Sequence, residues 1–120
     1  MFFITRERSK RWAVVVVPFP FTDRMARRKR PTVVLSRPQE SGSLVGQSVL
    51  AMIASAVHRS WPLDVPITDL AMAGIPAPSV VRMKLFTLDD RLVQRQVGTL
   101  AAPDAVAAGE SLARLLAARR

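Results

Sequence analysis

The sequence predicts a mostly β domain that ends in one helix, a small antiparallel barrel or curled sheet, and two observations support this prediction. Short apolar segments rich in Val, Ile and Leu are separated by Pro, Gly and polar residues, as β-strands are. The last segment instead has Pro near its start and Arg near its end, as helices do. With 120 residues the chain suits one core, and we expect a single domain over 1–120.

The first three apolar segments are taken as core elements. AVVVVPF (13–19) and PTVVLS (31–36) are short, β-branched and bounded by Pro and polar residues, which is typical of buried strands. SVLAMIAS (48–55) is equally apolar, but its length leaves strand and helix open.

The next three segments are interpreted as strands nearer the surface. WPLDVPI (61–67) contains two prolines, which cannot donate to a sheet ladder, so we expect an edge strand. SVVRMKLFTL (79–88) follows. RLVQRQVGTL (91–100) alternates apolar and polar residues, which fits a half-buried strand.

The final segment, PDAVAAGESLARLLAARR (103–120), is predicted to be a helix. Pro103 suits the first turn, Asp104 favours the positive N-terminal end, and arginines favour the C-terminal end. Its apolar stripe is expected from Val106, Leu112, Leu115 and Leu116.

The charge of the chain favours an anionic partner. The 18 basic residues outnumber nine acidic ones, the net charge is +9, and all the basic residues except Lys10, Lys29 and Lys84 are arginine. Because guanidinium groups bind phosphate in a bidentate manner and stack on bases, nucleic acid is the first expectation. An acidic protein is the second, and an anionic membrane the third.

Several classes of protein do not fit the composition. The chain has no cysteine and one histidine, His58, so it offers neither disulfides nor a Cys- or His-rich metal cluster. No apolar run reaches the roughly 18 residues needed to span a bilayer. The first residues place apolar residues before charges, unlike a secretory signal. We expect a cytoplasmic protein without metal or membrane partner.

A basic connection joins the first two predicted strands. It carries Arg24, Arg27, Arg28, Lys29 and Arg30. A solvated loop would explain most of these charges, but Arg30 directly precedes Pro31 at the mouth of a buried strand and is held more rigidly. Single aromatic residues such as Trp12 and Trp61 could stack on bases, although core or dimer-interface roles are commoner.

Taken in order, these segments resemble the PemK/MazF family of bacterial toxins from toxin–antitoxin pairs. The resemblance rests on VVVVPFPFTD (14–23), KRPTVVLS (29–36), LAMIAS (50–55), WPLDVPI (61–67), AGIPAPSVVRMKLFTLD (73–89) and RLVQRQVGTL (91–100). It implies a small SH3-like barrel with a C-terminal helix, a homodimer, and an acidic cognate antitoxin. It also implies a metal-independent endoribonuclease without cofactors that cuts single-stranded RNA.

This activity is compatible with a chain that lacks Cys, metal clusters and a His pair. RNA brings its own nucleophile, the 2′-OH, so the protein needs to align it and stabilise the charged phosphate. By resemblance, the catalytic arginines fall on Arg30 and Arg82. Ser55 is a further catalytic candidate, and Arg24, Arg27, Arg28, Lys29 and Lys84 are candidates for substrate binding.

One position departs from the family pattern. The threonine of its I-T-S segment, which helps to hold the phosphate, falls on Ala54, and the next residue would point to the opposite face of a strand. Losing one oriented donor can slow a reaction roughly 10²- to 10³-fold, so we expect impaired cleavage. Two alternatives follow: a catalytically weak module that binds antitoxin or RNA, and a DNA gyrase poison.

Overall fold

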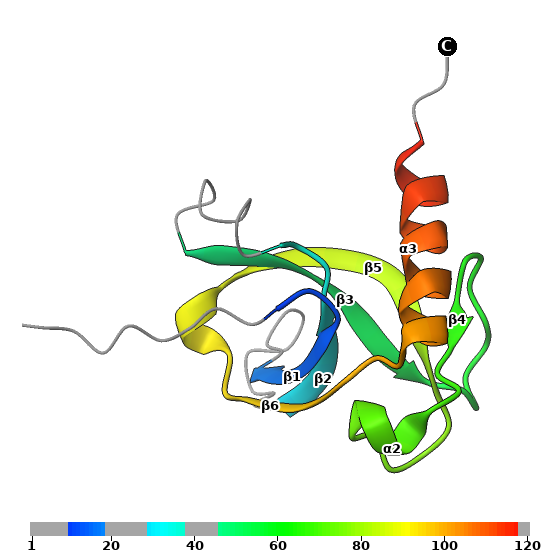
Figure 1. Cartoon of the computed structure of the whole chain (residues 1–120), viewed down its shortest axis with the longest axis horizontal. Helices are drawn as coiled ribbons and strands as arrows, with labels where there is room; N and C mark the ends of the chain where they lie inside the picture. Colours follow the sequence, from blue (N-terminus) through cyan, green and yellow to red (C-terminus); the bar gives the residue numbers. More distant parts are fainter. Residues whose placement is uncertain (1–9, 19–28, 38–45, 118–120) are drawn as a thin grey trace, which may run out of the picture.

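The fold is built on one antiparallel sheet of six strands, seen in a computed structural model that describes residues 10–18, 29–37 and 46–117. The strands are β1 (Ala13–Pro18), β2 (Lys29–Val34), β3 (Gln47–Ser55), β4 (Val65–Pro66), β5 (Ser79–Asp89) and β6 (Arg95–Thr99). They lie in the order β4-β5-β3-β2-β1-β6. The sheet curls on itself, and α3 (Ala102–Leu116) stands beside β4 (Figure 1). The predicted antiparallel barrel with a C-terminal helix is confirmed.

Side chains on the two faces of this sheet form two buried clusters. Successive residues of a strand point to opposite faces, so Val15 and Val17 join one cluster and Val14 joins the other. The small cluster consists of Ala13, Val15, Val17, Val34 and Leu50. The large cluster lies under the helices and includes Ala73 and Ala108. The segment at 48–55, left open by the sequence, is the central strand β3.

Helix α3 packs through a face that shares only Leu112 with the predicted apolar stripe. Val106, Leu115 and Leu116 are exposed, whereas Ala105, Ala108 and Leu112 contact the large cluster. The reason is steric: small alanines let the helix approach the sheet closely, and the Trp12 ring lies against Gly109.

The buried Asp104 fixes the start of α3 by accepting hydrogen bonds from Thr68 N, Thr68 Oγ1 and Asp69 N.

A second helix, α2 (Leu70–Ala73), was not predicted from the sequence. Asp69 caps it by accepting a hydrogen bond from Met72 N, and Gly74 ends it with a φ of 74°. A Cβ atom at Gly74 would collide with the backbone of Val97, and one at Gly98 with the backbone of Ala73. Two glycines therefore let α2 lie directly against the edge strand β6.

Two predicted strands are shorter than expected. In 61–67 only Val65 and Pro66 pair, at the edge of the sheet as predicted, because Asp64 ties the preceding residues into a turn. In 91–100 the strand begins only at Arg95. Asp89 accepts a hydrogen bond from Arg91 N and starts a single 3₁₀ turn, Asp90–Leu92, in place of an extended chain. Within the described ranges no helix is long and apolar enough to cross a membrane.

Candidate functional site

The side chain of Arg82, on β5, makes three hydrogen bonds to the connection between β3 and β4. Its Nε donates to Asp64 Oδ1 at 3.1 Å and its Nη2 donates to Asp64 Oδ2 at 2.9 Å, a bidentate ion pair. Nη2 also donates to the Arg59 carbonyl at 3.0 Å. Both charged side chains are about nine-tenths buried, with exposures of 11% and 9%. Arg82 thus fastens the 56–64 connection to the sheet.

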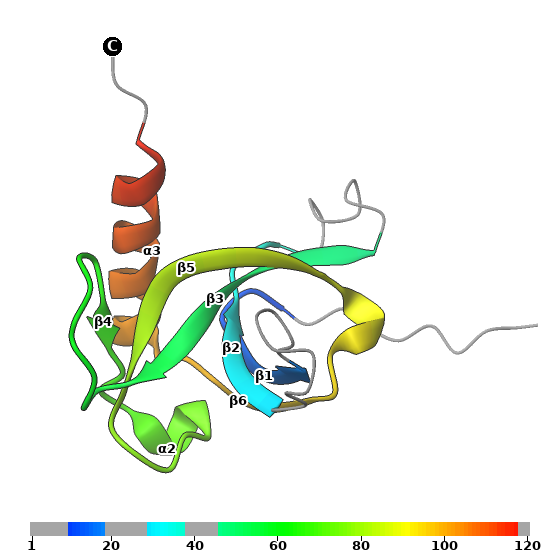
Figure 2. The same ribbon diagram turned by 180° about the vertical axis from the view of Figure 1, so that it is seen from behind.

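Trp61 completes this cluster from the same connection. The Arg82 guanidinium lies over its ring, 4.7 Å from the centroid, and Trp61 N donates to Asp64 Oδ2 at 2.9 Å. We call Arg82, Asp64 and Trp61 the Arg82 cluster. Figure 2 shows the strands that carry it, with β3 and β4 on either side of β5.

The ion pair shifts the pKa of both partners. Burial acts to raise the pKa of Asp64, but hydrogen bonds from the Arg82 side chain and the Trp61 backbone, with the charge of Arg82, outweigh it, so the pKa is lowered from 3.8. The hydrogen bond to Asp64 raises the pKa of Arg82. Both groups are therefore charged at neutral pH.

Arg30 lies at the start of β2 and is half-buried. It stands opposite Val17 on β1, so its side chain shares the face of the small cluster. Lys29, one residue earlier, is exposed and stands opposite Pro18. Arg30 is therefore partly buried on the face of the small cluster, while Lys29 faces water.

The register of β2, β3 and β5 brings three candidate positions to one face. Thr32 stands opposite Met52, and Met52 stands opposite Arg82. Arg30 and Ala54 each lie two residues beyond this row, on the same face, where the pairing of β2 and β3 ends. The face therefore carries Arg30, Ala54 and Arg82 on three neighbouring strands.

Ser55 and Lys84 lie outside this arrangement. Ser55 follows Ala54 and so belongs to the opposite face, where its Oγ accepts a hydrogen bond from Val57 N at 3.3 Å. Lys84 lies in an irregularity of β5, because Met52 pairs with Arg82 whereas Ala51 pairs with Leu85. The simple alternation that would place Lys84 beside Arg82 does not extend across this bulge.

Sequence comparison decides the family. Residues 10–116 match the family described as PemK-like, MazF-like toxin of type II toxin–antitoxin system. The chain belongs to this family. A search of curated proteins gave no match.

Solved structures show the same fold in MazF proteins. The chain is similar to a MazE–MazF structure from Deinococcus radiodurans, with 20% identity, a TM-score of 0.71, and coverage of 95% of this chain and 100% of that chain. It is also similar to the Mycobacterium tuberculosis toxin MazF-mt6, with 21% identity, a TM-score of 0.68, and coverage of 90% and 99%. A mycobacterial endoribonuclease in complex with its cognate antitoxin has 12% identity, a TM-score of 0.70, and coverage of 96% and 99%.

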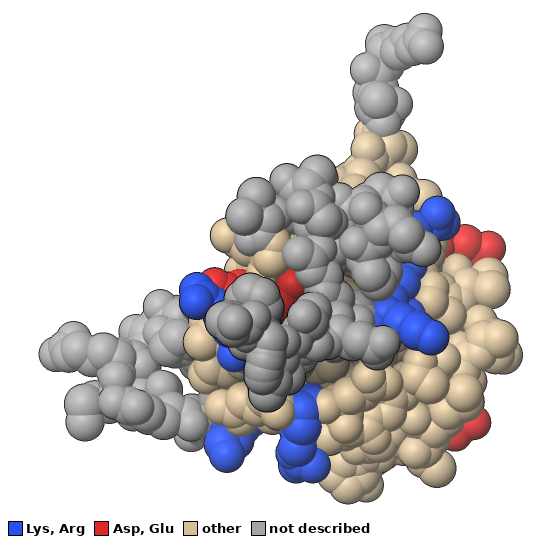
Figure 3. All heavy atoms as spheres, turned by 60° about the vertical axis from the view of Figure 1, so that its left-hand side comes forward, with Lys and Arg blue, Asp and Glu red and all other residues tan. Residues whose placement is uncertain are grey.

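In this PemK/MazF-like chain, part of the predicted site lies outside the described residues. Arg24, Arg27 and Arg28 of the basic connection fall there, so their role in substrate binding stays a prediction. Figure 3 shows more basic than acidic side chains on the described surface of one face. Among the described residues, no group of three His, Cys, Asp or Glu side chains could hold a metal ion.

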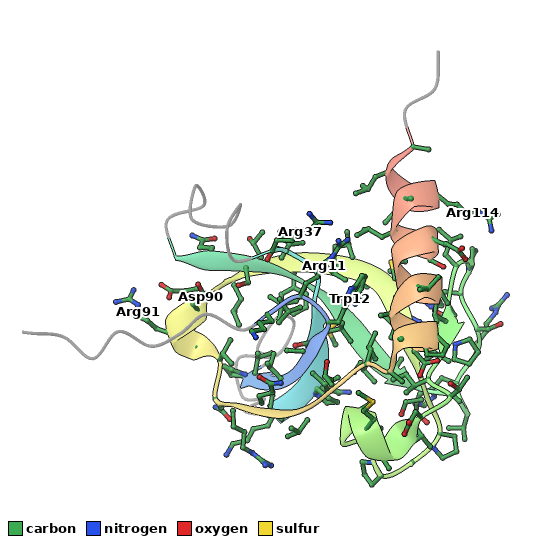
Figure 4. All side chains as sticks on the ribbon, in the orientation of Figure 1. Arg11, Trp12, Arg37, Asp90, Arg91 and Arg114 are labelled. Carbon is green, nitrogen blue, oxygen red and sulfur yellow. The ribbon has the colours of Figure 1, made fainter. Side chains whose placement is uncertain are left out.

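A second basic pair lies at the other end of β1 and β2. Arg11 precedes β1, Arg37 follows β2, and the two lie close together (Figure 4). The Arg11 guanidinium lies 4.6 Å from the Trp12 ring centroid. Burial, and then the charge of Arg37, lower the pKa of Arg11. This pair is separated from Arg30 by the length of the strands.

Sequence reasoning missed Asp64 as the partner of Arg82. The prolines of WPLDVPI suggested a strand edge, and nothing in the spacing linked residue 64 with residue 82. In the structure, Arg82 instead forms a buried salt bridge with Asp64. A direct role of Arg82 in catalysis stays a prediction.

Proposed function

We propose that this chain is the toxin of a toxin–antitoxin pair and acts as a metal-independent endoribonuclease on single-stranded RNA. Membership of the PemK-like, MazF-like toxins carries the proposal. The net charge of +9 and the likeness to a protein described as an endoribonuclease in complex with its cognate antitoxin support it.

The proposed reaction uses the RNA as its own nucleophile. The 2′-oxygen attacks the adjacent phosphorus, the bond to the 5′-oxygen breaks, and a cyclic phosphate and a free 5′-hydroxyl result. The proton of the 2′-hydroxyl leaves as the oxygen attacks, and the departing 5′-oxygen takes up a proton. The protein has to hold these atoms in line and stabilise the extra negative charge on the phosphate.

Arg30 is our candidate for the charge-stabilising group. A guanidinium remains charged and donates in a fixed fork, so Arg30 would act on the phosphate electrostatically rather than as a proton carrier. Because Arg30 is half-buried at the start of β2, we expect its side chain to have less freedom than one in a solvated loop, which favours a preorganised contact. Lys29, Lys84 and the basic connection would bind neighbouring phosphates, and Ser55 would be a further donor if the strand end rearranges around RNA.

Ala54 favours a second candidate, a module that binds RNA and antitoxin but cleaves slowly. A methyl group at this position offers no hydrogen bond to the phosphate near Arg30.

For both candidate functions we propose an acidic antitoxin as the protein partner, because the chain is strongly basic. The exposed Val106, Leu115 and Leu116 of α3 support a homodimer, which light scattering would test.

The test is cleavage of a long single-stranded RNA by the purified protein in EDTA, with the new ends mapped. Arg30→Ala should lower the single-turnover rate by roughly 10²- to 10³-fold while circular dichroism stays unchanged. Arg95→Ala is the matched control, because Arg95 is exposed on β6 opposite Val16, on the other face of the sheet. Equal rates for the parent and Arg30→Ala would reject the assignment. Absence of cleavage by the parent, with inhibition of DNA gyrase, would identify the gyrase poison instead.

A further inference from the structure

Trp61 is a large aromatic side chain that remains substantially accessible to solvent. It lies in the connection between β3 and β4, and 45% of its surface is exposed. The Arg82 guanidinium stacks on the ring and occupies one of its faces. We therefore expect the exposure to fall mainly on the other face and the ring edge.

Contacts around Trp61 hold the ring in place before any ligand arrives. Its backbone N–H donates to Asp64 Oδ2, and Asp64 N donates back to the Trp61 carbonyl at 3.2 Å. Asp64 is itself bound by both arms of the Arg82 fork. The next residue but one, Leu63, has a φ of 71°, a conformation that L-residues adopt only when neighbouring contacts enforce it. An aromatic ring on such a turn loses little freedom when another ring stacks on it.

The surroundings of the ring favour an anionic chain carrying flat rings. His58 and Arg59 lie two or three residues before Trp61 and are exposed, while the single acid of the turn, Asp64, is neutralised by Arg82. Proteins that bind single-stranded nucleic acids stack bases on aromatic rings and add cation–π contacts from arginine. Trp61, with Arg82 on one face of its ring, offers both.

We propose that the exposed face of Trp61 is a stacking subsite for one nucleobase of single-stranded RNA, held in orientation by Arg82 and Asp64. In this arrangement Arg82 is a positioning residue that acts through Trp61 and need not touch the phosphate. Stacking is tolerant of sequence, because every base has a π-face, so the subsite adds affinity and register rather than base identity. The proposal rests on the proposed function, since it assumes that RNA is the ligand.

Fluorescence gives the first test, because the chain has only two tryptophans. In a Trp12→Phe background, Trp61 is the only tryptophan. Titration with a 2′-O-methyl oligonucleotide, which cannot cleave itself, should quench its emission. An oligonucleotide of the same length with abasic sugars should bind through its phosphates and leave the emission largely unchanged. Equal quenching by both would overturn the stacking subsite.

Binding of the same oligonucleotide gives the second test. Trp61→Ala should weaken binding roughly 10- to 100-fold, the range for one lost base–aromatic stack, without changing the slope of log affinity against log salt. Trp61→Tyr should restore most of the affinity. Leu92→Ala is the matched control, because Leu92 is exposed to a similar extent, 48%, in the 3₁₀ turn. A changed salt slope would mean that phosphate contacts, not stacking, were lost.

A double-mutant comparison tests whether Arg82 affects RNA binding by positioning the Trp61 ring. Arg82→Lys keeps the charge but loses the planar fork and the stack, so it should weaken binding in the parent and add little in the Trp61→Ala variant. Additive losses would mean that Arg82 acts independently of Trp61, and that part of the proposal would fail. Circular dichroism of each variant shows whether the fold is retained, and Asp64→Asn provides an independent way to loosen the ring.

The outcomes separate this proposal from the ribonuclease proposal. Cleavage by the parent, with unchanged oligonucleotide binding in Trp61→Ala, would overturn the stacking subsite and leave the ribonuclease intact. Failure of the parent both to bind the 2′-O-methyl oligonucleotide and to cleave RNA would overturn both. If the emission of Trp61 responded to dilution of the protein and not to RNA, a second copy would cover the ring, and the nucleobase assignment would be wrong.

Discussion

Replacing Asp64 with asparagine is expected to destabilise the fold measurably, because Arg82 then loses its charged partner. Asparagine keeps the shape but has one oxygen in place of two, so at least one of the two charge-assisted hydrogen bonds from Arg82 is lost. Such a bond contributes roughly 1.5–3 kcal/mol, and the uncompensated charge of a nine-tenths buried guanidinium adds to the loss. We expect the free energy of unfolding at neutral pH to fall by about 2–4 kcal/mol.

The assay is urea unfolding of parent and variant, with thermal unfolding as a second measure. For a domain of this size, the expected change corresponds to a decrease in Tm of roughly 10 °C. Asp89→Asn is the matched control: Asp89 also pairs with an arginine, Arg91, but that guanidinium is 88% exposed. Although the pKa of Asp89 is lowered to about 2 by hydrogen bonds from Arg91, water screens the pair, so this variant should change stability little.

The effect of Asp64→Asn should also depend on pH. The pKa of Asp64 is lowered in the folded protein from its usual value of 3.8, so the folded protein binds the proton less readily than the unfolded chain. The contribution of the ion pair is complete above pH 3.8 and is lost as the pH falls through the lower folded value. The parent and the variant should therefore converge in stability below pH 3.8. A neutral-pH difference below about 0.5 kcal/mol, or one that persists unchanged in acid, would refute this account of the Arg82 cluster.

Three further substitutions test other parts of the structure. Asp104→Ala leaves three donors from Thr68 and Asp69 without their acceptor, so the free energy of unfolding, measured in urea, should fall by about 3 kcal/mol. A loss below about 1 kcal/mol would contradict the role of these hydrogen bonds at the start of α3. Gly98→Ala places a Cβ against the backbone of α2 and should lower the stability by at least about 2 kcal/mol, so an unchanged Tm would argue against that close approach. Ala54→Thr should raise the single-turnover cleavage rate by a factor on the order of 10–10³ and change RNA binding much less; equal rates would mean that another group already holds the phosphate.

Local patterns predicted most of the strands and the last helix because their signals lie within a few residues. The β-branched runs at β1 and β2 and the prolines at β4 act on the backbone where they occur. Arg30 could be singled out in the same way, since it directly precedes Pro31 and the β-branched run of β2. The short helix α2 was missed although Asp69 and Gly74 cap it, because four residues carry too little apolar periodicity to stand out.

The sequence by itself determined the charge of this protein, its alternation of buried and exposed strand residues, and its membership of a toxin family. Only the tertiary structure decided which face of α3 is buried and which acid neutralises Arg82. The physical reason is range: periodicity and capping depend on neighbours along the chain, whereas packing depends on which surfaces the sheet brings together. Asp64 is 18 positions from Arg82 and reaches it through the turn that follows β3. Likewise, Val106 and Leu116 are as apolar as any core residue, but small alanines on the opposite side allow α3 to approach the sheet, and they decide which face it buries.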